Sequence, residues 1–465
     1  MSVAGTAMKT GHGAVPESAE ALLRTDICGA FAGRFGIRLI GEQDGRLLLS
    51  LCAGADPGGL LQVVRFLAPP VDVSFERTDD ASTASLLDSI IAEAAHRNVA
   101  QIHFEPYNGG LVIRMRSNGA LREMLRIPAA AGQLIVSRIK AIAGLDRIEP
   151  QVTQEGRILT RSGGSLPDLG VSILPCIAGE RIVLRILDPD DGGSDLSAPG
   201  MPPAVNMLYR AALAEPGGLV ILAGPTGSGK TTSLYAGLRQ LNDGSRNILT
   251  VEDPVHQATA GVGQVEVDAP AGLTCATALR AILRQDPDVV MVGEIGNSET
   301  AEIAVQASAT GHLVLATIHA EDAVGAITRL RDMKIEPFLL ASTLRAVIAQ
   351  RLVRRLCPAC RVAVQTSASE SALLGFETGT TIYQARGCQK CSNSGYKGRI
   401  GVFEAIGVDD TIRRLINSGG DEAVIASHVF RQSQNIGSSA RSLVLEGVTT
   451  TEEAVRISRR ESEDA

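Results

Sequence analysis

A glycine-rich segment near the middle of the 465-residue chain carries the clearest chemical pattern. Residues 224–232 read G-P-T-G-S-G-K-T-T, which fits the phosphate-binding arrangement G-x-x-x-x-G-K-[ST]. The apolar run at 219–223 before it is typical of a buried strand, and the residues from Lys230 onward favour a helix. Backbone N–H groups in such a loop turn inward around phosphate oxygens, and the helix N-terminus adds partial positive charge. The segment therefore predicts binding of a nucleoside triphosphate.

Side chains in this loop have distinct predicted roles. Lys230 would reach the outer phosphates, and the hydroxyl of Thr231 can ligate Mg²⁺. The residues expected to contact the nucleotide are Gly224, Pro225, Thr226, Gly227, Ser228, Gly229, Lys230, Thr231 and Thr232.

Acidic residues flank the apolar run at 289–292, which is typical of another buried strand. An uncompensated carboxylate beside a buried strand is costly, so a role with a metal ion or with water is reasonable. Glu294, just after the run, is predicted to orient and polarise the attacking water, and Asp288, just before it, to bind Mg²⁺. Glu252 follows a further apolar run at 248–251 and is a second candidate for metal or water.

Histidines and arginines near these runs complete the candidate site. His312 and His319 bracket an apolar run at 313–317 and could detect the terminal phosphate through a hydrogen bond, although either imidazole could instead be structural. Arg280 and Arg284 are four residues apart and share one face of a helix that leads towards the nucleotide-binding edge. A solvated helix face is the alternative interpretation of these two arginines.

Four of the eight cysteines form two C-x-x-C pairs, Cys357 with Cys360 and Cys388 with Cys391, and 27 residues separate the pairs. Four thiolates in two such pairs suit tetrahedral Zn²⁺. Disulfides or unrelated core thiols are the alternatives, and a reducing cytosol disfavours disulfides. The other cysteines have no partner at metal spacing and are interpreted as ordinary buried residues: Cys28, Cys52, Cys176 and Cys275.

The elements that must position these residues alternate between strands and helices. Strands predicted at 219–223, 248–251, 289–292 and 313–317 are separated by helical patterns, which indicates an α/β fold with a mainly parallel sheet and helices on both faces. Ligands then bind at the carboxyl ends of the strands. The region before this sheet contains a helical pattern that starts at Leu86 and strands with alternating apolar residues.

Breaker-rich stretches divide the sequence into several parts. We predict a small N-terminal docking unit over 1–80, a second unit over 86–188, a linker over 189–204 and the nucleotide-binding unit over 205–465. Apolar residues make up 45% of the chain, which is typical of globular proteins, and the net charge of −7 gives no reason to expect nucleic acid as a partner. No apolar run could span a membrane and the N-terminus lacks a signal-peptide core, so a cytosolic location is expected.

Together these motifs resemble those of the secretion ATPase superfamily, in the branch that serves type II secretion and type IV pilus assembly. The likeness extends over residues 86–407 and rests on these segments: G-P-T-G-S-G-K-T-T (224–232), T-V-E-D-P-V (250–255), A-L-R-A-I-L-R-Q-D-P-D-V-V-M-V-G-E-I (278–295), T-G-H-L-V-L-A-T-I-H (310–319) and Q-R-L-V-R-R-L-C-P-A-C (350–360). It implies a RecA-like P-loop ATPase domain, with a zinc module at about 355–400 and C-terminal helices, preceded by a PAS-like α+β domain. It also implies a ring of six copies, ATP between the two halves of each copy, and the cofactors ATP, Mg²⁺ and Zn²⁺.

The resemblance further implies that arginines complete the site, at Arg185, Arg280 and Arg284. Two arginines of the family pattern are absent, because their positions read Gly170 and Gly296. An arginine that stabilises transition-state charge can be worth ~10³ or more in rate. Our hypothesis is therefore that the isolated protein hydrolyses ATP slowly or needs partners.

Two further features narrow the resemblance within the branch of type II secretion and type IV pilus assembly ATPases. The zinc cysteines and the small leading unit are similar to those of assembly-direction motors, and segments 33–40 and 63–71 resemble the first domain of type II secretion ATPases. That domain docks on the cytoplasmic part of an inner-membrane partner. The resemblance thus implies a cytoplasmic homohexamer, peripheral at the inner membrane of a bacterium, that meets this partner and a polytopic platform protein and reaches the membrane only through them.

Such a motor would couple ATP hydrolysis to pseudopilus assembly and protein export. A type IV pilus assembly ATPase and a weakly catalytic nucleotide-binding scaffold are the alternatives. A ring helicase shares the motor fold, but the acidic charge disfavours it.

Overall fold

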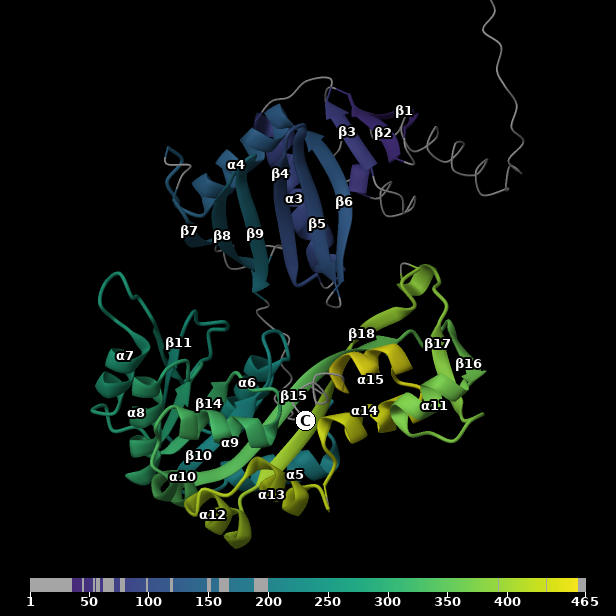
Figure 1. Ribbon diagram of the computed structural model, residues 1–465. Coiled ribbons are helices and arrows are strands. Elements are labelled where there is room, and N and C mark those ends of the chain that lie inside the picture. The colour runs from purple at the N-terminus through teal and green to yellow at the C-terminus, as the bar shows by residue number, and fades with distance from the viewer. Residues whose placement is uncertain are drawn as a thin grey trace, which may run out of the picture. The chain divides into compact units, whose positions relative to one another are not determined.

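The computed structural model describes residues 36–458, apart from 44–45, 53–54, 56–58, 62–70, 76–79, 98, 118–119, 149–151, 159–166, 188–199, 392 and 432. This part of the chain forms two compact units that divide after Leu187 (Figure 1). Each unit has its own sheet and its own buried core. Most of the predicted linker over 189–204 lies outside the described residues.

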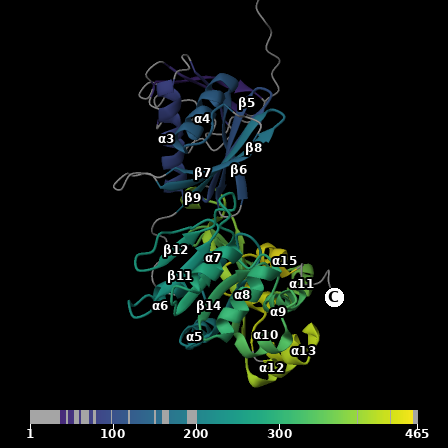
Figure 2. The same ribbon diagram turned by 90° about the vertical axis from the view of Figure 1, so that its left-hand side faces the viewer.

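The first unit contains, within its described residues, a nine-stranded sheet in the order β1-β2-β3-β6-β5-β4-β9-β8-β7, with two helices against one face (Figure 2). Alternate residues of the central strands, such as Ile102 and Phe104 on β4, are buried in this core, as a period of two requires. The elements are β1 (Ile37–Gln43), β2 (Arg46–Leu51), β3 (Val71–Phe75), α3 (Asp80–His96), β4 (Gln101–Tyr107), β5 (Gly110–Ser117), β6 (Ala120–Pro128), α4 (Ala129–Ile142), β7 (Gln154–Ile158), β8 (Asp168–Cys176) and β9 (Gly179–Leu187).

The leading strands belong to this same sheet. β3 pairs with β6 in parallel, with Val71 opposite Leu125. The guanidinium of Arg46 on β2 donates to Asp72 on β3 (2.8 Å) and also pairs with Glu123 on β6. The described residues of the predicted 1–80 unit therefore extend the sheet of the second predicted unit, and their docking role stays a prediction.

The second unit contains, within its described residues, a seven-stranded sheet in the order β12-β11-β13-β14-β10-β15-β18. Neighbouring strands from β12 to β15 all run parallel, and β18 pairs antiparallel with β15. This confirms the predicted α/β fold with a mainly parallel sheet. The strands are β10 (Gly218–Ala223), β11 (Ile248–Glu252), β12 (Gly263–Glu266), β13 (Val289–Val292), β14 (Leu313–Ile318), β15 (Leu344–Leu356) and β18 (Tyr396–Gly407).

Helices cover both faces of this parallel sheet, as the sequence predicts. On β10, Leu219 and Ile221 pack into the core that includes α7 to α10, whereas Val220 and Leu222 pack into the core beneath α5 and α6. Burial on both faces thus fixes the strand that leads into the phosphate loop. The helices are α5 (Pro203–Leu213), α6 (Lys230–Leu241), α7 (Cys275–Ile282), α8 (Ser298–Ala309), α9 (Ala323–Asp332) and α10 (Pro337–Thr343).

The chain after β15 forms a lobe over 357–395, called here the cysteine lobe, and then returns to the sheet as β18. The buried carboxylate of Glu404 on β18 accepts hydrogen bonds from the N–H groups of Ala323 (2.8 Å) and Ile436 (3.0 Å), the first residues of α9 and α14. Both helix N-termini carry partial positive charge, which suits a carboxylate. The remaining elements are β16 (Arg361–Gln365), α11 (Ala368–Leu374), β17 (Thr381–Ala385), η1 (Gln389–Cys391), α12 (Asp410–Asn417), α13 (Glu422–Val429), α14 (Ile436–Leu445) and α15 (Thr451–Ser458).

Within the described part of the chain, no helix is both long enough and apolar enough to cross a bilayer.

Replacing Glu404 by alanine should destabilise the second unit. The substitution leaves two buried helix N–H groups without their acceptor, which costs about 2 kcal/mol of unfolding free energy. Urea unfolding followed by circular dichroism would measure the loss. Glu446→Ala changes an exposed carboxylate just after α14 and is the matched control. Equal midpoints for the two variants would contradict the bridging role of Glu404.

Candidate active site and metal centre

The phosphate loop connects the buried end of β10 to the start of α6 at Lys230, where the sequence predicts the helix to begin. Gly227 and Gly229 have φ values of +77° and +89°, and Gly229 is the residue before the helix. At Gly224 a β-carbon would lie 2.4 Å from the backbone oxygen of Gln350 and 2.6 Å from Oγ of Ser228. The loop therefore needs glycine, both for its left-handed backbone and for its close contact with β15.

Polar groups inside this loop fit an anion. Nζ of Lys230 donates to the backbone oxygens of Gly224 (2.6 Å) and Pro225 (3.0 Å), so the ammonium lies folded across the loop. Oγ of Ser228 is buried and has no hydrogen-bond partner among the described residues. Burial lowers the pKa of Lys230, and the nearby carboxylate of Glu294 opposes this shift. An orphaned hydroxyl beside a buried ammonium is suited to phosphate oxygens.

Glu294 and His319 meet at the carboxyl edge of the same sheet, just past β13 and β14. Oε1 of Glu294 lies 3.0 Å from Nε2 of His319, and both side chains remain partly exposed. Thr317 joins the two strand ends, because its hydroxyl donates to the backbone oxygen of Gly293 (2.6 Å) and its own backbone oxygen accepts from Ile295 N–H (2.8 Å). Because β13 and β14 run parallel to β10, this pair lies at the same edge of the sheet as the phosphate loop. Glu294, His319 and Lys230 therefore lie at one edge of the sheet, and their catalytic roles stay predictions.

Glu252 ends β11 at the same edge, but its carboxylate is buried in a hydrogen-bond network. It accepts from the hydroxyl of Tyr235, from Oγ1 of Thr250 (2.7 Å) and from Nε2 of Gln264 (3.0 Å). Burial, together with the Glu252 carboxylate, raises the pKa of Tyr235, which therefore stays a donor. Sequence reasoning missed Tyr235 and Gln264, since neither belongs to a motif.

Two of the predicted site residues lie at the opposite edge of the sheet. Asp288 precedes β13, and its Oδ2 accepts from Asn247 N–H (2.7 Å). His312 precedes β14, and its Nδ1 lies 2.9 Å from the backbone oxygen of Ala307 at the end of α8. β13 and β14 both run parallel to β10, so residues before these strands are separated from the loop by the strand length, roughly 13 Å for four residues. The predicted Mg²⁺ role of Asp288 and the phosphate-sensing role of His312 are therefore wrong.

The predicted arginines are spread over different parts of the structure. Arg280 forms an exposed ion pair with Glu299 in the first turn of α8 (2.8 Å). Arg284 is exposed just beyond the end of α7, on the path towards the opposite edge. Arg185 lies on β9 of the first unit, exposed and directly opposite Gly170 of β8. Their roles in catalysis stay predictions.

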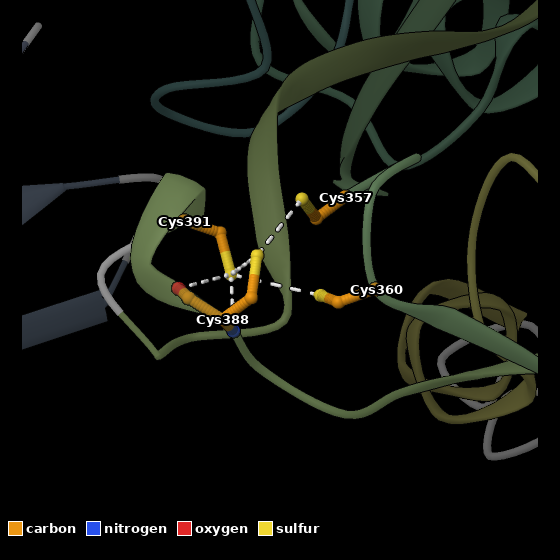
Figure 3. A group of neighbouring side chains, drawn as sticks. All are labelled: Cys357, Cys360, Cys388 and Cys391. Carbon is orange, nitrogen blue, oxygen red and sulfur yellow. Dashed lines mark hydrogen bonds between the residues drawn. The ribbon is translucent and has the colours of Figure 1, made fainter.

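The four cysteines of the two C-x-x-C pairs converge in the cysteine lobe (Figure 3). Their sulfur atoms all lie within 4.8 Å of one another, with separations of 4.0 Å for Cys357–Cys388, 3.8 Å for Cys360–Cys391 and 3.7 Å for Cys388–Cys391. Tetrahedral Zn²⁺ with Zn–S bonds of about 2.3 Å requires sulfur separations of about 3.8 Å. The geometry therefore fits a structural zinc ion.

Backbone donors prepare this cluster for a cation. The N–H groups of Cys388 (3.2 Å) and Gly395 (3.3 Å) point at Sγ of Cys391. Burial opposes ionisation of Cys391, yet these donors bring the pKa of its thiol to about 7. Among the other cysteines, Cys52 and Cys275 are partly buried, whereas Cys176 is exposed and corrects the expectation of burial; Cys28 lies outside the described residues.

Fold and loop together define a P-loop protein of the RecA-like class. The solved structure of the ATPase DotB from Legionella pneumophila aligns with 80% of this chain and 95% of its own, at a TM-score of 0.61 and 20% identity. The solved structure of the pilus retraction motor PilT with bound ADP aligns with 82% of this chain and 99% of its own, at a TM-score of 0.57 and 24% identity. These likenesses support the fold.

The family follows from sequence comparison. Residues 76–456 match the model of the family described as "Type II/IV secretion system protein", and the chain belongs to that family. It is 45% identical to "Type II secretion system protein E" of Pseudomonas aeruginosa, over 93% of this chain and 89% of that protein. It is 44% identical to "Type II secretion system ATPase E" of Vibrio cholerae, over 87% of this chain and 81% of that protein. The resemblance to type II secretion ATPases is confirmed.

Cys391→Ser should remove the metal that this cluster fits. We expect about one zinc ion per chain in the unaltered protein and a large loss in the variant, because three thiolates hold zinc less tightly than four. Mass spectrometry of the purified proteins would measure the metal. Cys176→Ser, which alters an exposed thiol outside the cluster, is the matched control. Equal zinc contents in the two variants would count against the assignment.

Proposed function

We propose that this protein is the ATPase of a type II secretion system and that it couples ATP hydrolysis to pseudopilus assembly and protein export. Family membership and the names of the relatives support the system. The observation that carries the chemistry is that the phosphate loop, Glu294 and His319 follow β10, β13 and β14 at one edge of one sheet. A loop that would bind phosphate and a carboxylate that can orient water then share one edge of the sheet.

The chain's own residues divide the work of the proposed reaction. Loop N–H groups and Lys230 bind the outer phosphates, for which the ammonium leaves the oxygens of Gly224 and Pro225. Thr231 would hold Mg²⁺, which neutralises phosphate charge when it is bound. His319 fixes one oxygen of Glu294 and leaves the other to orient the attacking water.

The remaining predicted groups take supporting roles in this proposal. The carboxylate oxygens of Glu252 already accept hydrogen bonds from three donors, so we assign Glu252 a structural role at the carboxyl edge of the sheet. Arg185, Arg280 and Arg284 would contribute positive charge once the site is assembled. The four cysteines would hold structural Zn²⁺.

The proposal extends to assembly. Six copies would form a ring in the cytoplasm, at the inner membrane of a bacterium. The leading strands would dock on the cytoplasmic domain of an inner-membrane partner, and the ring would act on a polytopic platform protein. A type IV pilus assembly ATPase remains the alternative within the same family.

Phosphate release tests the chemistry directly. Lys230→Ala should abolish ATP binding and turnover, whereas Glu294→Gln should keep binding and lose at least 100-fold in kcat, since only the water-orienting carboxylate is changed. The matched control is Glu302→Gln, an exposed carboxylate on α8. Turnover that survives Lys230→Ala would refute the proposed function.

The glycine at position 296 offers a gain-of-function test. A β-carbon there meets no heavy atom within 4 Å, so a longer side chain has room. If the missing arginines limit turnover, Gly296→Arg should raise kcat at least tenfold, alone or with Gly170→Arg, because a cation near the phosphates stabilises the transition state. Gly296→Ala is the control for backbone effects. An unchanged kcat would reject the idea that these arginines are rate-limiting.

A further inference from the structure

Two consecutive residues of β15, Gln350 and Arg351, are buried directly beneath the candidate site. Their exposed fractions are 1% and 5%. β15 pairs in parallel with β10 up to Ala223 opposite Ala349, so Gln350 lies just where the chain of β10 turns into the phosphate loop. Successive residues of a strand point to opposite faces of the sheet, so these two side chains contact different parts of the site.

Gln350 contacts both ends of the phosphate loop. Its Oε1 accepts a hydrogen bond from Oγ of Ser233, in the first turn of α6 (2.7 Å). A β-carbon on Gly224 would lie 2.4 Å from the backbone oxygen of Gln350, and one on Gly229 would lie 2.7 Å from its Nε2. The loop therefore rests against this one residue at its start and at its end.

Arg351 holds the segment that follows β14. Its Nη2 donates to the backbone oxygen of Glu321 (3.0 Å) and also pairs with the Glu321 carboxylate. Glu321 lies two residues after His319 and is 52% exposed, so burial alone does not fix its position. The ion pair therefore attaches the His319 segment to β15.

The burial of Arg351 is expensive for the fold. Its Nε is buried and has no hydrogen-bond partner in the described part of the chain. Removal of a guanidinium from water carries a desolvation penalty that an ion pair with a half-exposed carboxylate does not readily offset. A guanidinium kept here at such a cost calls for a role beyond stability.

We propose that Gln350 and Arg351 are positioning residues, called here the brace, that fix the distance between the two halves of the site. Gln350 holds the phosphate loop that carries Lys230, and Arg351 holds the segment whose His319 orients Glu294. The brace rests on the proposed ATPase function. A displacement of about 1 Å between reacting groups can cost 10²-fold in rate. The brace can therefore affect turnover through Arg351 and nucleotide binding through Gln350, although neither residue is assigned a contact with the nucleotide.

The brace predicts a division between binding and catalysis. Arg351→Met keeps the volume and removes the guanidinium, and it should lower kcat at least tenfold while the Kd for a fluorescent ATP analogue stays within twofold. Gln350→Met removes the acceptor for Ser233, and it should raise that Kd at least fivefold. Glu321→Gln, at an exposed position that folding tolerates, should reproduce the effect of Arg351→Met on kcat.

Arg345→Met is the matched control. Arg345 lies on the same strand, but its guanidinium donates to the backbone oxygens of Gly217 (3.2 Å) and Ser342 (2.8 Å) at the opposite edge of the sheet. This variant should leave kcat and Kd within twofold. Arg351→Lys, which retains a cation, should recover part of the lost turnover.

Phosphate release, nucleotide binding and thermal unfolding would be measured on the full-length protein under one set of conditions. The brace is overturned if Arg351→Met and Glu321→Gln lower kcat no more than Arg345→Met. It is also overturned if Arg351→Met lowers kcat and the unfolding temperature while raising Kd to a similar extent, as general damage to the fold would. Lys230→Ala separates the two proposals, because its failure to abolish turnover would reject the ATPase function itself. The effect of Gln350→Met on Kd tests the binding half of the brace independently of turnover.

Discussion

The parallel direction of β10, β13 and β14 decides which side chains can meet at the phosphate loop. Each of these strands is buried on both faces, so hydrophobic packing fixes its position and leaves only its ends for polar residues. Residues that follow the strands then gather at one edge, where Gly224, Glu294 and His319 are found. The residues at this edge come from segments that are far apart in the chain, and the strand order of the sheet brings them together.

Polar groups buried beneath that edge give it a defined shape. Glu252 accepts from three donors, and Arg351 attaches the segment after β14 to β15. Such networks favour one arrangement, since any shift leaves a buried donor or acceptor unpaired. Lys230 differs from them, because in this structure its ammonium bonds only loop carbonyls that it can leave. An ammonium whose partners are neutral carbonyl oxygens can exchange them for phosphate oxygens, which suits a site that must bind and release an anion.

The sequence predicts the parts of the site that local chemistry determines. The phosphate loop needs glycines at fixed places, and the two C-x-x-C pairs need only to converge, so both could be recognised from spacing. Asp288 and His312 misled the prediction, because a residue before a strand and one after it are close in sequence but lie at opposite edges. Tyr235, Gln350 and Arg351 had no motif to mark them, since their contacts depend on packing between distant segments. The continuity of β3 with β6 also rests on long-range pairing that no local pattern encodes.

One strand links the nucleotide edge to the metal centre. β15 contains Gln350 and Arg351 in its middle and ends at Leu356, immediately before Cys357. β18 pairs with it from Gly407 to Tyr396, so the two longest strands of the sheet continue past the phosphate loop and support the cysteine lobe. Metal held by the cysteines would tie together the ends of these strands, in addition to the hydrogen bond from Cys357 N–H to the backbone oxygen of Gly395 (2.9 Å). The middle of β15 therefore lies beside the phosphate loop, and its end leads directly into the candidate metal centre.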